Sequence, residues 1–223
     1  MRIALYWAPK HSTPLGRAAT DWLKGEEGHV SGINNEEMHR LLSAPKHYGV
    51  HATLKPPFQL QAGYVLEDVE RELGLFAAEQ QNKPFWLPGL EVAQIGKFFC
   101  LRPVGNSEKL EDFSAATVKR FDHFRKPAEE DEIERRRAPG LTIRQEHLLL
   151  EWGYPYVLDE FKFHLTLTGN VEDSNLFQPL KQELLKRFTP ALQFPCPFDS
   201  LSMFLQYGTQ PFFEYRSWSL GKI

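Results

Sequence analysis

The chain contains one four-residue pattern twice, and both copies carry side chains that can move protons. GVHATLKPP places His51 and Thr53 in the first His-x-Thr-Leu pattern, and FKFHLTLTG places His164 and Thr166 in the second. Histidine is the side chain whose ordinary pKa lies closest to neutral pH, so it can accept or donate a proton there. A threonine hydroxyl can donate a hydrogen bond to an anion. The repeated pattern therefore indicates acid–base chemistry on a negatively charged substrate.

Both patterns are expected on β-strands. Prolines 56 and 57 close the first copy and disfavour helix before them, and residues 161–167 alternate between apolar and polar types. In a strand, residues two apart point to the same face. Each histidine therefore projects together with its threonine, while the leucines enter the core.

Two such strands lying side by side about a pseudo-twofold axis would bring the two imidazoles together across a cleft. A neutral imidazole can take a proton from an attacking water while a protonated one gives a proton to a leaving alkoxide. The threonine hydroxyls can donate to phosphoryl oxygens, where charge grows in the transition state. This chemistry suits a phosphodiester and requires no metal, so we expect no cofactor.

A third His-x-Thr triplet, at His11-Ser12-Thr13, is expected to be structural. Pro14 follows it directly and favours the first turn of a helix, so the triplet falls at a helix cap rather than on a strand.

The paired motifs resemble those of the 2H phosphoesterase superfamily. The branch encoded beside phosphonate (carbon–phosphorus lyase) genes is a closer match, carried by YGVHATLKPPF from Tyr48, FDHFRKP from Phe121, RRR from Arg135 with the LTIRQ that follows, WGYPYV from Trp152, and FKFHLTLTGN. The resemblance implies two pseudo-symmetric lobes, each contributing one motif to a central cleft. It implies hydrolysis of a cyclic or linear phosphodiester, or the reverse ligation, without metal.

The resemblance also implies site residues. It carries over His51, Thr53, His164 and Thr166 as catalytic positions. The phosphonate-associated branch implies a small phosphorylated sugar or nucleotide as substrate, and a ribose cyclic phosphate suits that context.

Several further residues are candidates for substrate binding, each with a structural alternative. Strand geometry puts Lys55 on the face of the first histidine, and Thr168 on the face of the second. Lys55 can hold a phosphate or remain solvated, and Thr168 can add a hydroxyl. Tyr48 can stack on a base or sugar, or pack at the lobe edge. Tyr154, beside a proline, can line the groove or pack in a rigid turn.

The basic run Arg135–Arg137 follows an acidic stretch. This arrangement favours an exposed, charge-balanced helix over a phosphate clamp. Arg144 and Gln145 lie near the start of the next helix, where anions are favoured. The family resemblance adds Arg136, Arg144 and Gln145 to the candidates.

Periodicity, caps and turn residues predict the elements that must position these residues. Strands are expected over 2–8, at both motifs, within 85–104 with a turn near Gly96, and over 200–220 with a turn near Gly208. Helices are expected from Pro14 to Gly25, from Asn34 or Asn35 to Pro45, around 65–76, 110–121 and 129–138, from Thr142 to Gly153, and around 176–188. The predicted fold class is α+β, with two pseudo-symmetric lobes, each an antiparallel sheet with helices outside, and a central cleft. We expect one bilobal domain over residues 1–223, a lobe boundary near 105–125 and a helical insertion at about 125–153.

Composition limits the class of function. The chain has 223 residues, 42% hydrophobic and 25% charged, with a formal net charge of −3. That balance argues against a dedicated nucleic-acid binder. The two cysteines, at positions 100 and 196, argue against a disulfide scaffold or zinc module. No apolar run approaches the length of a membrane span, and we expect a cytoplasmic protein.

The sequence thus predicts a phosphodiesterase that uses a histidine pair on a small sugar or nucleotide cyclic phosphate, with a link to phosphonate metabolism. Two alternatives remain: an enzyme of RNA ends, either cyclic phosphodiesterase or ligase, and a non-catalytic protein that binds phosphorylated ligands.

Overall fold

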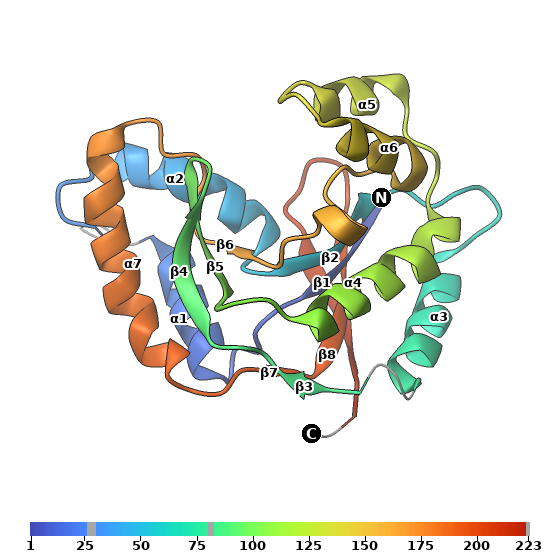
Figure 1. The fold of residues 1–223 in the computed structure, drawn as a ribbon, viewed down its shortest axis with the longest axis horizontal. Coiled ribbons are helices and arrows are strands. Elements are labelled where there is room, and N and C mark those ends of the chain that lie inside the picture. Colours follow the sequence, from blue (N-terminus) through green and yellow to red (C-terminus); the bar gives the residue numbers. More distant parts are fainter. Residues whose placement is uncertain (26–29, 80–82, 222–223) are drawn as a thin grey trace.

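A computed structural model describes residues 1–25, 30–79 and 83–221 (Figure 1). The strands are β1 Arg2–Trp7, β2 Ala52–Phe58, β3 Phe85–Trp86, β4 Leu90–Ile95, β5 Phe98–Pro103, β6 Leu165–Thr166, β7 Pro197–Phe198, β8 Ser200–Gln206 and β9 Phe213–Ser219. The helices are α1 Pro14–Lys24, α2 Asn35–Tyr48, α3 Leu66–Ala78, α4 Glu108–Phe121, α5 Glu130–Arg137, α6 Ile143–Trp152 and α7 Phe177–Leu192. Every strand pair among these is antiparallel. The predicted α+β class with antiparallel sheets is confirmed.

The first motif lies on the edge strand of a four-stranded sheet with the order β2-β1-β8-β9. An edge position explains why the strand tolerates Pro56 and Pro57, since prolines cannot donate to a neighbouring strand. The pairing shifts by one residue between Leu5 opposite Lys55 and Tyr6 opposite Thr53. Leu54 is therefore the extra residue of a β-bulge, which reverses the alternation of side chains after Thr53.

The second motif lies on β6, at the edge of the sheet β4-β5-β6. Only two residues of β6 form a regular strand, so the predicted strand over 161–167 is shorter than expected. Beyond it, the backbone N–H groups of Leu167 and Thr168 both donate to the carbonyl of Phe99, at 2.9 and 3.3 Å. Two donors on one carbonyl make a second bulge, at the leucine that ends the second His-x-Thr-Leu and the residue after it.

Two helices hold this short strand in place. The indole Nε1 of Trp22 on α1 donates to the carbonyl of Leu167 at 2.7 Å. The N–H of Gly169 donates to the carbonyl of Leu41 on α2 at 2.5 Å. Pro45, four residues after Leu41, has no N–H to fill that carbonyl, so the helix leaves the carbonyl open to the motif segment. The prediction that Pro45 ends this helix is wrong, because α2 continues to Tyr48.

The two sheets share one core. In Figure 1, α1, α2 and α7 gather beside β4 and β5, while α3 and α4 lie beside β1 and β8. The buried cluster includes Leu5 and Trp7 from the first sheet and Leu101 and Leu165 from the second. β2 and β6 lie next to each other where the sheets meet. A single core therefore fixes the two motif strands relative to one another.

Each sheet combines strands from both halves of the chain. β1 pairs with β2 and with β8 near the C-terminus, and β5 pairs with β4 and with β6. A lobe boundary near 105–125 therefore does not separate the sheets. None of the described helices is long and apolar enough to cross a membrane.

Helices α5 and α6 form a separate layer at the top of Figure 1. Thr142 and Gln145 form the predicted capping box of α6, and Gly153 ends that helix in the left-handed conformation (φ 73°). Leu148 packs with Val118 and Val157 in a small cluster apart from the main core. This small apolar cluster is one of the contacts that join the layer to the body.

Candidate active site

One cavity of about 620 Å³ contains both motifs. His51 and Thr53 from β2, together with Thr166 from β6 and His164 just before it, line this cavity. All four side chains are half-buried. The geometry assumed from the sequence, with the two imidazoles facing a shared cleft, is present in the structure.

His51 is held in one orientation by its own backbone and by an aromatic ring. Its Nδ1 lies 2.9 Å from the carbonyl oxygen of Gly49, and Nε2 lies 3.2 Å from the hydroxyl of Thr53. A carbonyl oxygen can only accept, so Nδ1 carries the proton and Nε2 accepts. The ring of Tyr6 stacks on the imidazole with centroids 3.7 Å apart and planes inclined by 16°. His51 thus presents a lone pair at Nε2 to the cavity.

Burial lowers the pKa of His51 to about 4. The nearby charge of His164 lowers it as well, whereas the hydrogen bond to Gly49 acts in the opposite direction. The imidazole is therefore neutral at neutral pH, as a general base must be.

His164 repeats the backbone arrangement of His51. Its Nδ1 lies 2.7 Å from the carbonyl oxygen of Lys162, two residues earlier, so the backbone again engages Nδ1 and not Nε2. Phe98 lies beside the ring, with centroids 5.7 Å apart and planes inclined by 45°. Burial lowers the pKa of His164, and the hydrogen bond to Lys162 opposes this shift.

Three of the tentative binding residues also line the cavity: Tyr48, Arg136 and Tyr154. Tyr48 stacks on Phe212, with ring centroids 5.3 Å apart and planes inclined by 24°. The guanidinium of Arg136 lies over the ring of Tyr154, 4.9 Å from its centroid. The sequence favoured an exposed charge-balanced helix for the arginine run, and for Arg136 that interpretation is wrong, since only 18% of its side chain is exposed.

Lys55 and Thr168 point away from the cavity, contrary to prediction. The Lys55 side chain is 1% exposed and forms an ion pair with Asp122 at 2.9 Å. The hydroxyl of Thr168, fully buried, accepts from the N–H of Phe99 at 3.0 Å. Both predictions assumed unbroken strand alternation, and the bulge at the leucine of each motif reverses it.

Arg144 and Gln145 do not line the cavity either. Arg144 is exposed and forms two hydrogen bonds to Asp159, Nε to Oδ2 at 2.8 Å and Nη2 to Oδ1 at 2.5 Å. Gln145 caps α6 and donates through Nε2 to Glu160 at 2.9 Å. Glu160 does line the cavity, so Gln145 contacts a residue of the cavity wall without lining the cavity itself.

Sequence reasoning missed Tyr6, Arg2 and Glu160. Arg2 and Tyr6 lie on alternate positions of β1, on the sheet face that opens to the cavity. The alternation of β1 was readable, but which of its faces borders the cleft depends on the sheet order, which a sequence does not reveal. Glu160 lies in a 3₁₀ turn without a recognisable motif.

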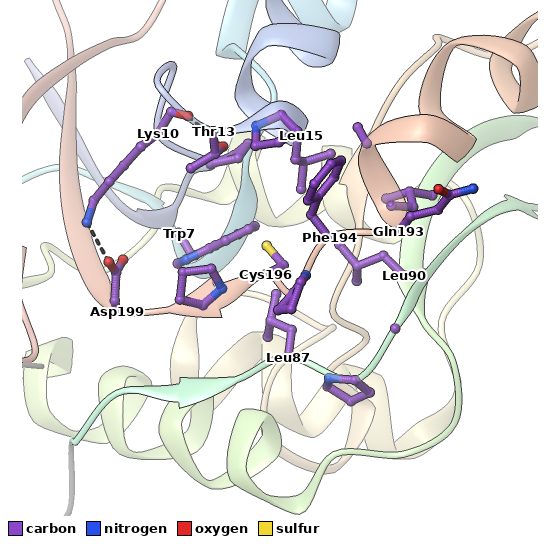
Figure 2. A pocket seen from close by; sticks show the side chains of 18 of the residues that line it. Trp7, Lys10, Thr13, Leu15, Leu87, Leu90, Gln193, Phe194, Cys196 and Asp199 are labelled. Atoms are coloured by element: carbon purple, nitrogen blue, oxygen red, sulfur yellow. Dashed lines mark hydrogen bonds and ion pairs between the residues drawn. The ribbon is translucent and has the colours of Figure 1, made fainter. Parts of the chain in front are cut away.

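A second cavity, of about 290 Å³, lies at the end of β1 and contains none of the motif residues (Figure 2). Trp7 borders it from the β1 face opposite to Tyr6, and Lys10 pairs with Asp199 at 2.5 Å. Burial raises the pKa of the Cys196 thiol there to about 12, and Asp199 adds to the shift. A protonated thiol is a weak nucleophile. This cavity lacks the paired acid and base of the larger one.

The third His-x-Thr triplet is structural, as predicted. The hydroxyl of Thr13 accepts from the N–H of Gly16 at 3.0 Å and caps α1. Within the described parts of the chain, no group of three or more His, Cys, Asp or Glu side chains is arranged to hold a metal ion.

Comparison with known proteins identifies the family. Residues 53–214 match the family described as "Protein of unknown function (DUF1045)". The chain belongs to this family.

Two curated relatives carry the name "Ribose 1,5-bisphosphate phosphokinase PhnN". The protein from Janthinobacterium sp. (strain Marseille) is 30% identical over 227 residues, which cover 96% of this chain and 50% of the relative. The protein from Laribacter hongkongensis (strain HLHK9) is 30% identical over 184 residues, covering 79% of this chain and 42% of the relative. The chain spans half or less of the length of these two proteins.

Solved structures of similar fold include E. coli LigT complexed with 3′-AMP and a protein described as a phosphoesterase. The first is 11% identical with a TM-score of 0.45, and the second is 12% identical with a TM-score of 0.48. Each match covers 99% of this chain and 98% of the other. At these values the likeness does not assign a function.

Proposed function

We propose that this protein is a phosphoesterase that hydrolyses a small cyclic phosphate or phosphodiester of a sugar or nucleotide by acid–base catalysis between His51 and His164, without a metal. One observation carries the proposal. Both imidazoles line the same cavity, and each has its Nδ1 engaged by its own backbone, which leaves Nε2 for chemistry.

In the proposed hydrolysis, His51 is the base. Its low pKa keeps Nε2 unprotonated, so it takes a proton from water as the water oxygen attacks phosphorus. The bond from phosphorus to the leaving oxygen breaks, and His164 gives that oxygen a proton from Nε2. The products are a phosphate monoester and a free hydroxyl. In ligation, the two roles are exchanged.

His164 must be protonated before it can act as the acid. Burial disfavours this form in the free protein. A bound phosphodiester brings a negative charge to the cavity, and an opposite charge within a few ångströms favours the protonated imidazole. Substrate binding therefore prepares the acid, while the Thr53 and Thr166 hydroxyls donate to the non-bridging oxygens. In the free protein Thr53 instead donates to Nε2 of His51.

The size and lining of the cavity support an organic group beside the phosphate. About 620 Å³ is ample for a sugar phosphate and lies within the range of small-molecule sites. The name of the two relatives refers to a ribose phosphate ester. Together with the resemblance to the phosphonate-associated branch, this favours a ribose cyclic phosphate over other substrates, and a role in phosphonate metabolism.

The test is a panel of cyclic phosphates of ribose and of nucleosides, incubated with the wild-type protein and the His51→Ala/His164→Ala variant, each with and without chelator. We expect turnover by the wild type that chelator does not abolish, and none above background in the double variant. Tight binding without turnover would instead identify a non-catalytic binding protein. Binding of short RNA with an affinity that falls steeply as the salt concentration rises would favour an enzyme of RNA ends.

A further inference from the structure

Tyr6 lies beside the first histidine on the face of the sheet that borders the cavity. β1 is an inner strand, and its Tyr6 is paired with Thr53 on β2 and with Ser202 on β8. His51 comes two residues before Thr53, so Tyr6 and His51 are diagonal neighbours across two strands and project from the same face. Hydrogen bonds on both edges of β1 fix the backbone from which the tyrosine projects.

Other aromatic rings hold the ring of Tyr6 in place. Phe204 and Phe212 lie 5.0 and 6.3 Å from it, centroid to centroid, and Tyr48 packs against the same cluster. Tyr6 is 1% exposed, although it lines the cavity. A ring packed in this way keeps one orientation, because turning it would open a void among its neighbours.

Tyr6 completes the set of contacts that orient His51. The Nδ1 edge of the imidazole faces the carbonyl of Gly49, and the Nε2 edge faces the hydroxyl of Thr53. Two hydrogen bonds in the plane of a ring leave it free to tilt about the line between them. The Tyr6 ring, stacked at 3.7 Å, opposes that tilt, whereas the Phe204 ring is 6.3 Å away and inclined by 39°.

The second histidine shows that this stack is not a property of the motif. Both imidazoles place Nδ1 against a backbone carbonyl two residues earlier. The ring of Phe98 lies 5.7 Å from that of His164 and is inclined by 45°. Within the part of the chain that the structure describes, a parallel aromatic stack therefore distinguishes His51 from His164.

The stack also keeps water from one face of the His51 imidazole. The titratable and charged side chains that share the cavity with it are Arg2 and Tyr6 on β1, Tyr48 at the end of α2, Arg136 on α5, Tyr154, Tyr156, Glu160 and Lys162 between α6 and β6, and His164. A protonated imidazole over a ring face gains a cation–π attraction, which would raise its pKa. Burial nevertheless lowers the pKa of His51 to about 4, so the exclusion of water outweighs that attraction.

We propose that Tyr6 is a positioning residue for His51, whose ring holds the imidazole with Nε2 toward the cavity and keeps it dry, so that His51 rather than His164 serves as the base. The inference rests on the proposed function. Tyr6 acts through its ring and not through its hydroxyl. Phenylalanine should therefore replace it, and leucine should not.

Proton NMR of the two imidazoles tests the stack without a substrate, with His51→Gln and His164→Gln to assign the signals. Protons over the face of an aromatic ring are shifted upfield, so the His51 ring protons should lie upfield of those of His164 in wild type and in Tyr6→Phe. In Tyr6→Leu they should move downfield, and the midpoint of the His51 titration should rise by at least about one pH unit, because water reaches the imidazole.

Phe212→Leu is the matched control. Phe212 is 6% exposed in the same cluster and, among the described residues, has a ring contact with Tyr6 but none with His51. This variant should keep the wild-type His51 signals and titration. Thermal unfolding verifies that all variants are folded.

Kinetics on a substrate from the cyclic phosphate panel then connect the stack to catalysis. Tyr6→Leu should lower kcat roughly 10- to 100-fold through misplacement of the base. The low-pH limb of its kcat/KM profile should move to higher pH, since a base of higher pKa is lost to protonation earlier as the pH falls. A purely structural role would reduce the folded fraction and leave that limb in place. Tyr6→Phe and Phe212→Leu should stay close to wild type.

The inference and the proposed function fail in different ways. Equal losses in Tyr6→Phe and Tyr6→Leu would assign the effect to the hydroxyl and overturn the inference. Wild-type His51 protons that are not upfield of those of His164 would also overturn it, and that measurement stands even where Tyr6→Leu does not fold. The expected NMR changes without turnover of any cyclic phosphate or phosphodiester would support the effect of Tyr6 on His51, and only the enzymatic proposal would fail.

Discussion

The two copies of the His-x-Thr-Leu motif share their local geometry but not their surroundings. In both, Nδ1 of the histidine donates to the carbonyl two residues earlier, and a β-bulge includes the leucine of the motif. Yet the first copy lies on a seven-residue strand and the second on a two-residue strand. The shared features come from the motif itself, and the differences come from what packs against it.

The surroundings give the two imidazoles different electrostatics. His51 has a parallel stack with Tyr6 and a hydroxyl at Nε2, while the aromatic neighbour of His164 among the described residues is Phe98, in a tilted contact. Burial lowers the pKa of both, to about 4 for His51. A repeated motif can thus supply two similar groups, and the fold then makes one of them the stronger candidate for the base. The proposed division of roles follows from this difference.

The largest expected effect is on kcat in the two histidine variants, and it distinguishes the general base from the general acid. His51→Ala and His164→Ala should each lower kcat roughly 10²–10⁴-fold on an alkyl phosphodiester. A p-nitrophenyl ester departs as a stable phenolate and needs no proton, so His164→Ala should be largely rescued on that substrate. His51→Ala should stay impaired on both. Steady-state kinetics with the paired substrates measure the difference.

Equal rescue of the two variants would contradict the assignment of different roles to the two histidines. Rescue of His51→Ala alone would make His51 the acid and His164 the base. His11→Ala, in the third His-x-Thr triplet, provides a control that should leave both rates at the wild-type level.

The elements that position the site were largely predictable because local signals specify them. Capping at Thr142 with Gln145, the glycine at 153 and the turn at Gly96 each appear where the sequence places them. The paired histidines were found because the motif occurs twice. These features depend on residues close together in the chain, whose interactions a sequence pattern records directly.

The predictions that were wrong concern features that depend on contacts between residues far apart in the chain. A bulge is set by the register between strands, so the inward turn of Lys55 and Thr168 could not be read from spacing alone. The continuation of α2 past Pro45 has the same cause, since the carbonyl that proline leaves open finds its donor at Gly169, far along the chain. The partial burial of Arg136 depends on its contact with the ring of Tyr154, which lies beyond the next helix, again a tertiary effect.

We expect an effect of intermediate size on folding stability, because the pKa of His51 differs between the folded and the unfolded chain. The pKa of His51 is about 4 in the folded protein and near 6.5 when unfolded, so the unfolded chain binds more protons between these values. Folding stability is therefore full above pH 6.5 and falls as the pH is lowered toward 4, by at most about 3 kcal/mol from this group. Urea unfolding at pH 7 and pH 4.5 should show a smaller loss for His51→Gln than for wild type.

His164→Gln extends that measurement to the second motif. The pKa of His164 is also lowered, so its contribution has the same sign, and we expect it to be smaller than that of His51. A larger effect at His164 would contradict the proposed ranking of the two imidazoles. The ratio of the two effects therefore measures how unequal the surroundings of the motifs are.

The smallest effect on catalysis is expected at Lys55, the residue on the far side of the first bulge. Lys55 donates to Asp122, which also accepts from Arg125 at 2.9 Å, and burial lowers the pKa of Lys55 to about 8. Lys55→Met leaves Asp122 with its arginine partner, so we expect a loss of about 1–3 kcal/mol in stability and kcat and KM close to wild type.

Thr53→Val, two residues earlier, should give the opposite profile, because Thr53 faces the cavity and Lys55 faces α4. Losing a donor to the transition state lowers kcat roughly 10²–10³-fold, while a half-buried methyl in place of a hydroxyl changes stability little. Urea unfolding and steady-state kinetics on the two variants together test whether the bulge turns Lys55 away from the cavity while Thr53 faces it. A loss of activity in Lys55→Met as large as that in Thr53→Val would mean that the lysine reaches the phosphate, and that the strand alternates without interruption through Leu54.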